Sequence, residues 1–379
     1  MARAYLDHAS SSPLRPAALE AMLPYLQGHP ADPGRVHSDG RATRVALEEA
    51  REAVAALLGA RPREAVFTAT GTEAVNTAVY GALGRAPSGT RPHLVTTAVE
   101  HSAVLEACRR ADADLTIVDV DRKARVRADD VLAAIRPDTA LVNVQLANHE
   151  VGTLQTALPA VASETRDRGV LLHVDACAAA GHVPLDFAAL GADLCSVTAH
   201  KLGGPKGAAA LLVRRGLRLP PLLVGGAQER ARRAGIEDVP AIVGFGAAAA
   251  ELADDRLAGE AAVSRAQTER LVAAALAVDG VTQLGDPDQR VPHLVCLAVE
   301  DVEAEPVLLG LDQRGVAVHS GSSCSSEALE PSPVLAAMGV DAERSLRPSV
   351  GWSTTDDDVA AFVEAFPEVV AKMRALRGG

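Results

Sequence analysis

The first two thirds of the chain alternate between short apolar runs and longer stretches with helical spacing. The apolar runs, rich in Leu and β-branched residues, lie at 65–68, 93–97, 115–118, 141–144, 170–174 and 194–197. Residues 42–58 place alanine, valine and leucine on one stripe and predict an amphipathic helix. Repeated alternation of strand and helix is typical of a mostly parallel sheet covered by helices. We therefore expect an α/β fold whose functional residues gather at the C-terminal ends of the strands.

The pattern changes after about residue 239. An alanine-rich helical region is predicted over 239–278, followed by a strand at 291–299, a helix at 306–314 and a closing amphipathic helix at 356–374. We interpret this part as a smaller α+β domain. The predicted division is a large domain over residues 14–250 and a small domain made of residues 1–13 and 251–379.

Length and charge narrow the class of protein. With 379 residues, the chain can form two domains that share one cleft. The net charge of −12 argues against direct nucleic-acid binding, and the arginines between 214 and 233 form either a solvated face or a docking site. No apolar run predicts a membrane span, and no apolar signal core follows Met1, so the expected location is cytoplasmic.

The five cysteines have irregular spacing, which predicts neither a disulfide framework nor a metal site. Cys108, Cys177, Cys195 and Cys296 lie in helical or apolar stretches, and we expect them in the core. Cys324 differs, because its segment 320–327 is small and polar. We expect this cysteine to be exposed, as a reactive thiol must be.

Four positions at predicted strand ends suggest one kind of chemistry. Lys201, one of only four lysines, follows an apolar strand, where an amine could attack an aldehyde and move a proton. Residues 70–72 open a helix and could hold a phosphate. Asp175 could hold a protonated ring nitrogen, and His101 could stack on a flat ring. Each position also has a purely structural explanation when it is considered alone. Lys201 could be a surface lysine, residues 70–72 and Asp175 could be helix caps, and His101 could be a structural histidine.

Together these residues describe a site for pyridoxal 5'-phosphate (PLP). The sequence resembles the group I cysteine desulfurases (NifS/IscS-like) of the class V aminotransferase superfamily, with PLP fold type I. That resemblance implies a large domain with a mostly parallel seven-stranded sheet and a smaller α+β C-terminal domain. It rests on an ordered series of motifs, which are Tyr5-Leu-Asp-His, Thr72-Glu with Asn76, Glu100-His, Asn148-His-Glu-Val-Gly, His173-Val-Asp, His200-Lys, Gln228-Glu-Arg, Ser320-Gly-Ser-Ser-Cys and Arg347.

The resemblance also implies a role for each matching residue. Lys201 holds the cofactor covalently and moves the α-proton, while His101 stacks on its ring and takes part in proton transfer. Asp175 pairs with the ring nitrogen, and Cys324 is the nucleophile that receives sulfur. The remaining roles are cofactor binding by Gly71, Thr72, His149, Thr198 and His200, and substrate binding by Arg347 and Asn148.

The implied activity is conversion of L-cysteine to L-alanine, with a persulfide on Cys324 that passes to an acceptor protein. A homodimer is implied as well. The resemblance does not identify the acceptor protein, which could belong to iron–sulfur assembly, to tRNA or DNA thiolation, or to natural-product sulfur incorporation. Two alternatives are a PLP-dependent C–S lyase or selenocysteine lyase, and a low-activity paralogue that acts as a scaffold for a sulfur-transfer partner.

The chain departs from the family pattern at five positions. The departures are His149 for a usual asparagine, Ala178 for a glutamine, Ile236 for a threonine, Trp352 for an arginine, and Asp32 for an asparagine near the substrate. Each missing neutral hydrogen bond costs on the order of 1 kcal/mol. We therefore expect a specialised or less efficient member.

Overall fold

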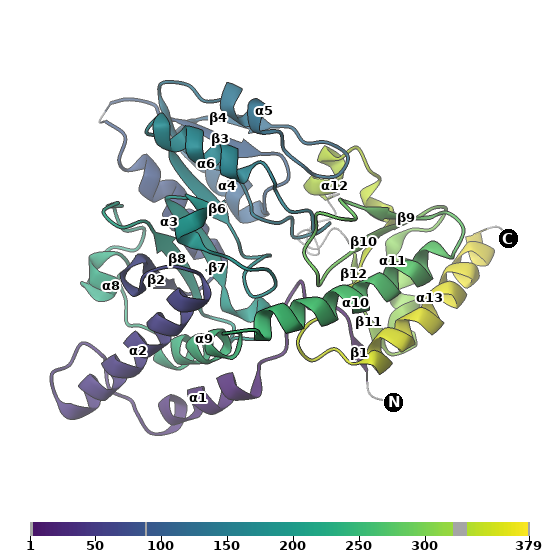
Figure 1. Cartoon of the computed structure of the whole chain (residues 1–379), viewed down its shortest axis with the longest axis horizontal. Coiled ribbons are helices and arrows are strands. Elements are labelled where there is room, and N and C mark those ends of the chain that lie inside the picture. The colour runs from purple at the N-terminus through teal and green to yellow at the C-terminus, as the bar shows by residue number, and fades with distance from the viewer. Residues whose placement is uncertain (1–2, 88, 321–331, 378–379) are drawn as a thin grey trace.

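The computed structural model describes residues 3–87, 89–320 and 332–377, so Cys324 lies outside the described residues. Short strands joined by helices build most of the chain (Figure 1). The strands are β1 (Ala4–Tyr5), β2 (Ala65–Thr68), β3 (His93–Thr97), β4 (Asp114–Val118), β5 (Thr139–Asn143), β6 (Leu171–Asp175), β7 (Leu194–Thr198), β8 (Ala209–Val213), β9 (Val281–Leu284), β10 (Cys296–Val299), β11 (Val316–Ala317), β12 (His319–Ser320) and β13 (Ser345–Arg347).

The helices of at least four residues lie between these strands and at the chain ends. They are α1 (Pro16–Gln27), α2 (Ser38–Leu57), α3 (Gly71–Leu83), α4 (Ser102–Arg110), α5 (Ala128–Ala133), α6 (Leu158–Asp167), α7 (Phe187–Leu190), α8 (Gln228–Ala231), α9 (Val239–Glu251), α10 (Arg256–Leu276), α11 (Ala304–Gln313), α12 (Pro333–Ala337) and α13 (Asp356–Arg377).

A seven-stranded sheet forms the centre, in the order β2-β8-β7-β6-β5-β3-β4. All its strands run parallel except β8, which pairs antiparallel with β2 and β7. The prediction of a mostly parallel α/β sheet is confirmed. The sequence pattern missed β8, which follows the glycine turn after Lys201 without polar alternation.

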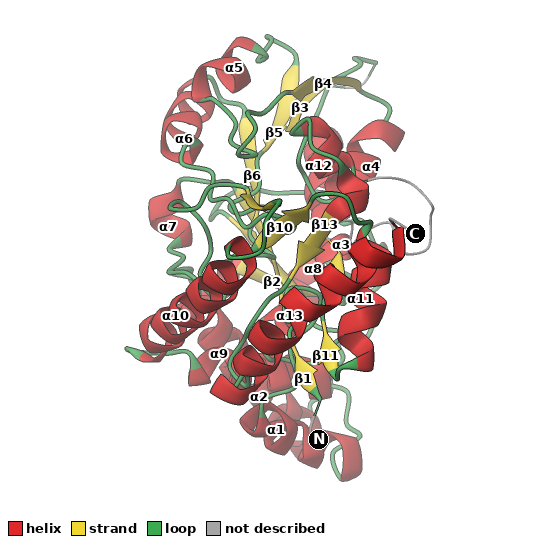
Figure 2. Ribbon diagram, turned by 90° about the vertical axis from the view of Figure 1, so that its right-hand side faces the viewer, coloured by secondary structure: helices red, strands yellow, loops and turns green. Residues whose placement is uncertain are grey.

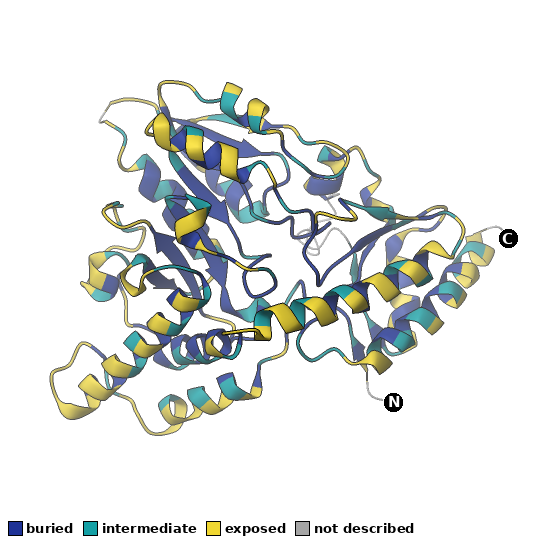
Figure 3. Ribbon diagram, in the orientation of Figure 1, coloured by how far each residue is buried: buried dark blue, intermediate teal, exposed yellow. Residues whose placement is uncertain are grey.

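Helices cover both faces of this sheet. On one face, α3 and α4 pack on Leu94, Leu141 and Leu194. On the other face, α2, α6 and α9 pack on alternating residues such as Val142, Val174 and Val197, as the two-residue period of strands requires. The strands are therefore buried along most of their length, whereas the outer faces of the helices are exposed (Figure 3).

A second group of elements lies beside the large sheet. It contains the four-stranded sheet β12-β13-β10-β9 and the pair β1–β11, and α10 and α13 lie side by side on one flank (Figures 1 and 2). Its core is separate from those of the large sheet and centres on Leu271, Phe362 and Phe366. The division at residues 14–250 stays a prediction.

Two element predictions in this second region need correction. The helical region expected over 239–278 is two helices, because the chain turns between Leu252 and Asp255, with Asp254 at φ 55°. The strand expected at 291–299 covers only Cys296–Val299, and β9 before it was not predicted.

Candidate active site

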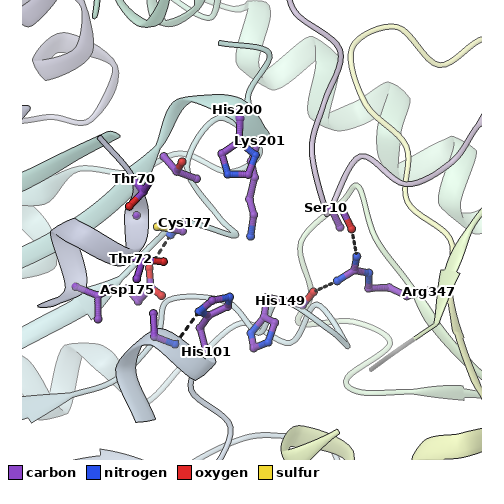
Figure 4. A pocket seen from close by; sticks show the side chains of 15 residues that line it. Ser10, Thr70, Thr72, His101, His149, Asp175, Cys177, His200, Lys201 and Arg347 are labelled. Carbon is purple, nitrogen blue, oxygen red and sulfur yellow. Dashed lines mark hydrogen bonds between the residues drawn. The ribbon is translucent and has the colours of Figure 1, made fainter. Parts of the chain in front are cut away.

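A cavity of about 360 Å³ opens at the C-terminal ends of the parallel strands. Nine of the predicted residues line it, from segments that are far apart in sequence. Seven of them lie in strands β6 and β7 of the large sheet or at the first turn of the helices that directly follow strands β2, β3 and β7. These seven, here called the sheet wall, are Gly71, Thr72, His101, Asp175, Thr198, His200 and Lys201. The opposite side, here called the substrate wall, contains Ser10, His149 and Arg347. Lys201 extends into the space between these groups (Figure 4).

The backbone of Lys201 is fixed from behind by the N-terminal segment. Lys201 ends the short 3-10 helix Ala199–Lys201, and its carbonyl accepts a hydrogen bond from Ser12 Oγ at 3.0 Å. The Arg15 guanidinium holds the next carbonyl, that of Leu202, at 2.9 Å. Gly203 follows at φ +87°, and a Cβ there would lie 2.6 Å from Arg15 Cγ. This packing directs the half-buried Lys201 side chain into the cavity.

The N-terminus of α3 forms one end of the cavity. Thr70 caps the helix by accepting a hydrogen bond from Glu73 N at 3.0 Å, so the following backbone N–H groups face the cavity. Gly71 is required by close packing, because a Cβ there would lie 2.9 Å from Cys177 Sγ. Thr198 Oγ1 and His200 Nδ1, both buried, have no hydrogen-bond partner among the described residues. Burial and the nearby Lys201 lower the pKa of His200 to about 4, so this ring is neutral at pH 7.

Asp175 is a buried carboxylate surrounded by donors. Its Oδ1 accepts from Ser196 Oγ at 2.8 Å and from Cys177 N at 3.0 Å. Burial pushes the pKa of Asp175 upward, but electrostatic interaction with the His101 and His173 side chains and the Cys177 hydrogen bonds outweigh burial and lower it. Asp175 is therefore ionised and suited to hold a cationic group.

Two histidines stand edge to face across the cavity, with ring centroids 5.0 Å apart. His101 caps α4, and its Nδ1 accepts from Ala103 N at 3.1 Å. Because Nδ1 is an acceptor, the proton of the neutral ring lies on Nε2. His149 approaches Glu150, with 3.6 Å between Nε2 and the carboxylate oxygen.

Arg347 closes the substrate wall. It is buried at the end of β13 and donates to His149 O at 3.0 Å, to Ser10 Oγ at 2.7 Å and to Asp7 Oδ1 at 3.2 Å. These partners come from the N-terminal segment and from the loop after β5. The guanidinium is therefore held in place at the cavity, where its planar donors match a carboxylate.

Asn148 differs from the prediction. It is fully buried and does not line the cavity. Its Nδ2 donates to Val99 O at 3.1 Å, and its Oδ1 accepts from Glu150 N and Val151 N at 2.9 and 2.8 Å. These hydrogen bonds make Asn148 the support of the turn that carries His149, and its predicted contact with substrate stays a prediction.

Cys177 also differs from the prediction of a core cysteine. Cys108, Cys195 and Cys296 are buried as expected, but Cys177 lies in the loop after β6 and lines the cavity. Burial, followed by the charge of Asp175, raises its thiol pKa well above the usual range, so the thiol stays protonated. Its neighbour Ala178 is buried and offers no polar group to the site.

The three remaining departures from the family pattern do not line the cavity. Asp32 Oδ1 accepts from Gly34 N at 2.7 Å in the loop after α1. Trp352 donates its indole N–H to Pro13 O at 2.9 Å, and the Arg15 guanidinium lies 5.4 Å above its ring. Trp352 thus braces the segment that fixes Lys201. Ile236 is 65% exposed and carries no contact to the cavity.

The residues present fit PLP. The unpartnered hydroxyl of Thr198 and the N-terminus of α3 suit a phosphate, and the ionised Asp175 suits a protonated ring nitrogen. Lys201 supplies the amine that an aldehyde needs.

Comparisons with known proteins agree with this chemistry. "Cysteine desulfurase IscS" of Methanosarcina thermophila is 38% identical over 378 residues, covering 98% of this chain and 93% of that protein. A solved NifS-like protein superposes with a TM-score of 0.90 at 28% identity, covering 98% of this chain and 100% of that one. SspA, solved in complex with cysteine, gives a TM-score of 0.81 at 29% identity and covers 92% and 98%.

The family model for aminotransferase class-V matches residues 4–362. Members of this family and the cysteine desulfurases within it depend on PLP. The fold, the cavity and this match together show that the chain belongs to the aminotransferase class V family.

Proposed function

We propose that this protein is a PLP-dependent cysteine desulfurase that converts L-cysteine to L-alanine and transfers the sulfur through Cys324. One observation carries the proposal. The cavity brings the Lys201 amine between an ionised carboxylate, Asp175, and a fixed guanidinium, Arg347. The relatives named cysteine desulfurase, at 38–40% identity over nearly the whole chain, support the same reading.

The described residues divide the work as follows. When bound, PLP supplies an electron sink for the bonds at the α-carbon of the substrate. Asp175 would hold its ring nitrogen, while Thr198 and the N-terminus of α3 would hold its phosphate. Arg347 binds the substrate carboxylate and thereby orients the α-proton toward the Lys201 amine, which removes it. His101 presents Nε2–H to the same space and can hold or release a proton there.

The sulfur step rests on sequence and family, because Cys324 lies outside the described residues. The Cys324 thiolate attacks the substrate sulfur, so that an S–S bond forms as the C–S bond breaks. The electron pair of the broken bond stays on carbon, which takes a proton and leaves as alanine. The persulfide then passes to an acceptor protein.

We extend the proposal to a homodimer in the cytoplasm. Two apolar residues between β8 and α9, Val224 and Ile236, are 84% and 65% exposed. Exposed apolar side chains of this kind support a surface that a second copy of the chain covers. Three arginines of the cluster, Arg214, Arg230 and Arg233, form ion pairs with Asp193, Glu48 and Glu73. Within the described residues, no helix is both long and apolar enough to cross a membrane.

Product analysis tests the proposal. The holoenzyme, incubated anaerobically with L-cysteine and a thiol reductant, is expected to release alanine and sulfide in equal amounts. Cys324→Ala should keep the cofactor absorption but lose protein persulfide, whereas the matched control Cys296→Ala, a buried thiol, should keep both. Pyruvate in place of alanine would indicate a C–S lyase. Cofactor binding without either product would indicate a scaffold.

A further inference from the structure

A strip of polar side chains crosses an otherwise apolar face of the central sheet. On the face beneath α3 and α4, neighbouring positions are Leu141, Leu171 and Leu194. Between them stand three fully buried polar residues, Asn143 on β5, His173 on β6 and Ser196 on β7. A buried polar group disfavours folding unless it forms hydrogen bonds. Three such groups in one row therefore need either hydrogen-bond partners or a functional reason to be there.

The three residues form a chain of contacts that ends on Asp175. The strand register places Asn143 opposite His173, and Ser196 opposite Asp175. His173 Nδ1 lies 2.9 Å from Asn143 Oδ1, and its Nε2 lies 3.2 Å from Ser196 Oγ. Ser196 Oγ then donates to Asp175 Oδ1 at 2.8 Å. The row therefore connects the interior of the sheet to the cavity carboxylate.

The protonation of this row follows from its geometry. A serine hydroxyl has one hydrogen, which Ser196 donates to Asp175, so His173 Nε2 must carry a hydrogen and donate it to Ser196. Burial lowers the pKa of His173 to about 4, so the ring is neutral at pH 7 and Nδ1 is an acceptor. In the structure Asn143 Oδ1 faces His173 Nδ1, and Nδ2 lies 3.5 Å from Cys108 Sγ. A neutral ring with its hydrogen on Nε2 requires the opposite orientation of this amide, in which Nδ2 donates to Nδ1, and the oxygen and nitrogen of an asparagine amide can exchange places without changing its shape. In this arrangement every hydrogen bond of the row points toward Asp175.

We propose that His173 and Ser196 are positioning residues, which hold Asp175 in place and stabilise its charge so that a bound pyridine nitrogen keeps its proton. The inference rests on the proposed function, because the ring nitrogen is that of PLP. The other titratable groups that interact with Asp175 are His101, Glu100 and the thiols of Cys177 and Cys195, and none of them belongs to the row.

The direction of the effect follows from the role of the donors. Each donor to an ionised carboxylate makes it a weaker base. Without Ser196, the Asp175 carboxylate becomes a stronger base and draws the shared proton away from the ring nitrogen. Loss of His173 Nε2 acts in the same direction more weakly, because it removes polarisation of the Ser196 hydroxyl.

The test uses holoenzyme loaded with PLP that carries ¹⁵N in its ring. In Ser196→Ala, the ring-nitrogen resonance should move part of the way toward that of an unprotonated ring, and alanine formation should fall about tenfold. Ser196→Thr, which keeps the hydroxyl, should restore the wild-type resonance. His173→Asn should also shift the resonance, because the shorter amide does not reach Ser196. His173→Gln, whose amide nitrogen can take the place of Nε2, should shift it less.

Ser345→Ala serves as the control, because it removes a buried serine hydroxyl that bonds to Ala342 O far from the row. An unchanged resonance in both Ser196→Ala and His173→Asn, equal to that of the control, would overturn the proposal even if activity fell. A wild-type protein that binds PLP but does not release alanine would reject the desulfurase and leave the resonance test valid. Failure of the wild-type protein to bind PLP would reject both.

Discussion

The two walls of the cavity are built in opposite ways. The sheet wall uses residues at the ends of neighbouring parallel strands, so Asp175 and Lys201 lie close because their strands, β6 and β7, pair. The substrate wall joins residues that no sheet ladder brings together, since Arg347 contacts Ser10 across 337 positions of sequence. The sheet wall is therefore formed by the pairing of neighbouring strands. The substrate wall forms only when the second group of elements packs beside the large sheet. We expect the sheet wall to control cofactor binding and the substrate wall to control substrate binding.

Removing the amine of the sheet wall should have the largest effect. Lys201→Ala is expected to lower alanine formation roughly 10³-fold or more, because a positioned proton-transfer group alone contributes 10²–10⁴. The cofactor should then be lost on gel filtration, which absorbance of the eluted protein measures. Lys206→Ala, which removes an exposed lysine of the same loop, is the control. Equal activity in the two variants would contradict the assignment of Lys201.

A second test concerns Glu100, a buried acid beneath the sheet wall. Its Oε1 accepts from Thr97 Oγ1 at 2.7 Å and from Gln145 N at 2.9 Å, and burial, with a contribution from Asp175, raises its pKa to about 7. A carboxyl with a raised folded pKa binds more protons when folded, so stability falls as pH rises from about 4.5 to 7.

Glu100→Gln removes this titration and keeps the two hydrogen bonds. Between pH 5 and pH 8 the free energy of unfolding of the wild type should fall on the order of 3 kcal/mol further than that of the variant. Urea unfolding at both pH values measures the difference. Parallel stability curves for the two proteins would show that Glu100 does not titrate in this range.

The corresponding test of the substrate wall is Arg347→Lys. Lysine keeps the charge but loses the planar pair of donors, so KM for L-cysteine should rise roughly 30-fold, which corresponds to about 2 kcal/mol. Cofactor affinity should stay within about twofold, as fluorescence titration would show. A large loss of cofactor affinity in Arg347→Lys would contradict the expectation that the substrate wall controls substrate binding alone.

Ser10→Ala should give the smallest effect on the same wall. It removes one hydrogen bond to Arg347 and leaves Asp7 and His149 O in place. KM should rise about fivefold, or about 1 kcal/mol, which is less than the roughly 1.5–3 kcal/mol of a hydrogen bond to a charged group because two other bonds still hold Arg347. Steady-state kinetics measure it, with Ser11→Ala as the neighbouring control. A change in kcat without a change in KM would place Ser10 in a different role.

The contrast between the walls explains what the sequence could predict. Apolar runs ending in Asp175 and near Lys201 predicted both the sheet and its functional edge, because parallel strands end together. Asn148 was predicted at the site from the family motif, and only its hydrogen bonds show that it supports the turn before His149. Cys177 was missed because its alanine-rich surroundings look like core, although the segment is a loop. Arg347 came only from family resemblance, since no local pattern marks a contact made across the whole chain.

The distance between Asp7 and Arg347 along the chain has a consequence for biosynthesis. Ala9 N donates to Ser349 Oγ, and Ser349 N donates to Leu6 O, so residues 6–9 lie against the segment that follows β13. A ribosome must make nearly the whole polypeptide before these segments can meet. The large sheet can form earlier, because its strands lie within residues 65–213. The newborn protein therefore acquires the lysine side of its cavity first and its substrate side last, and a chain that terminates before residue 347 has the first without the second.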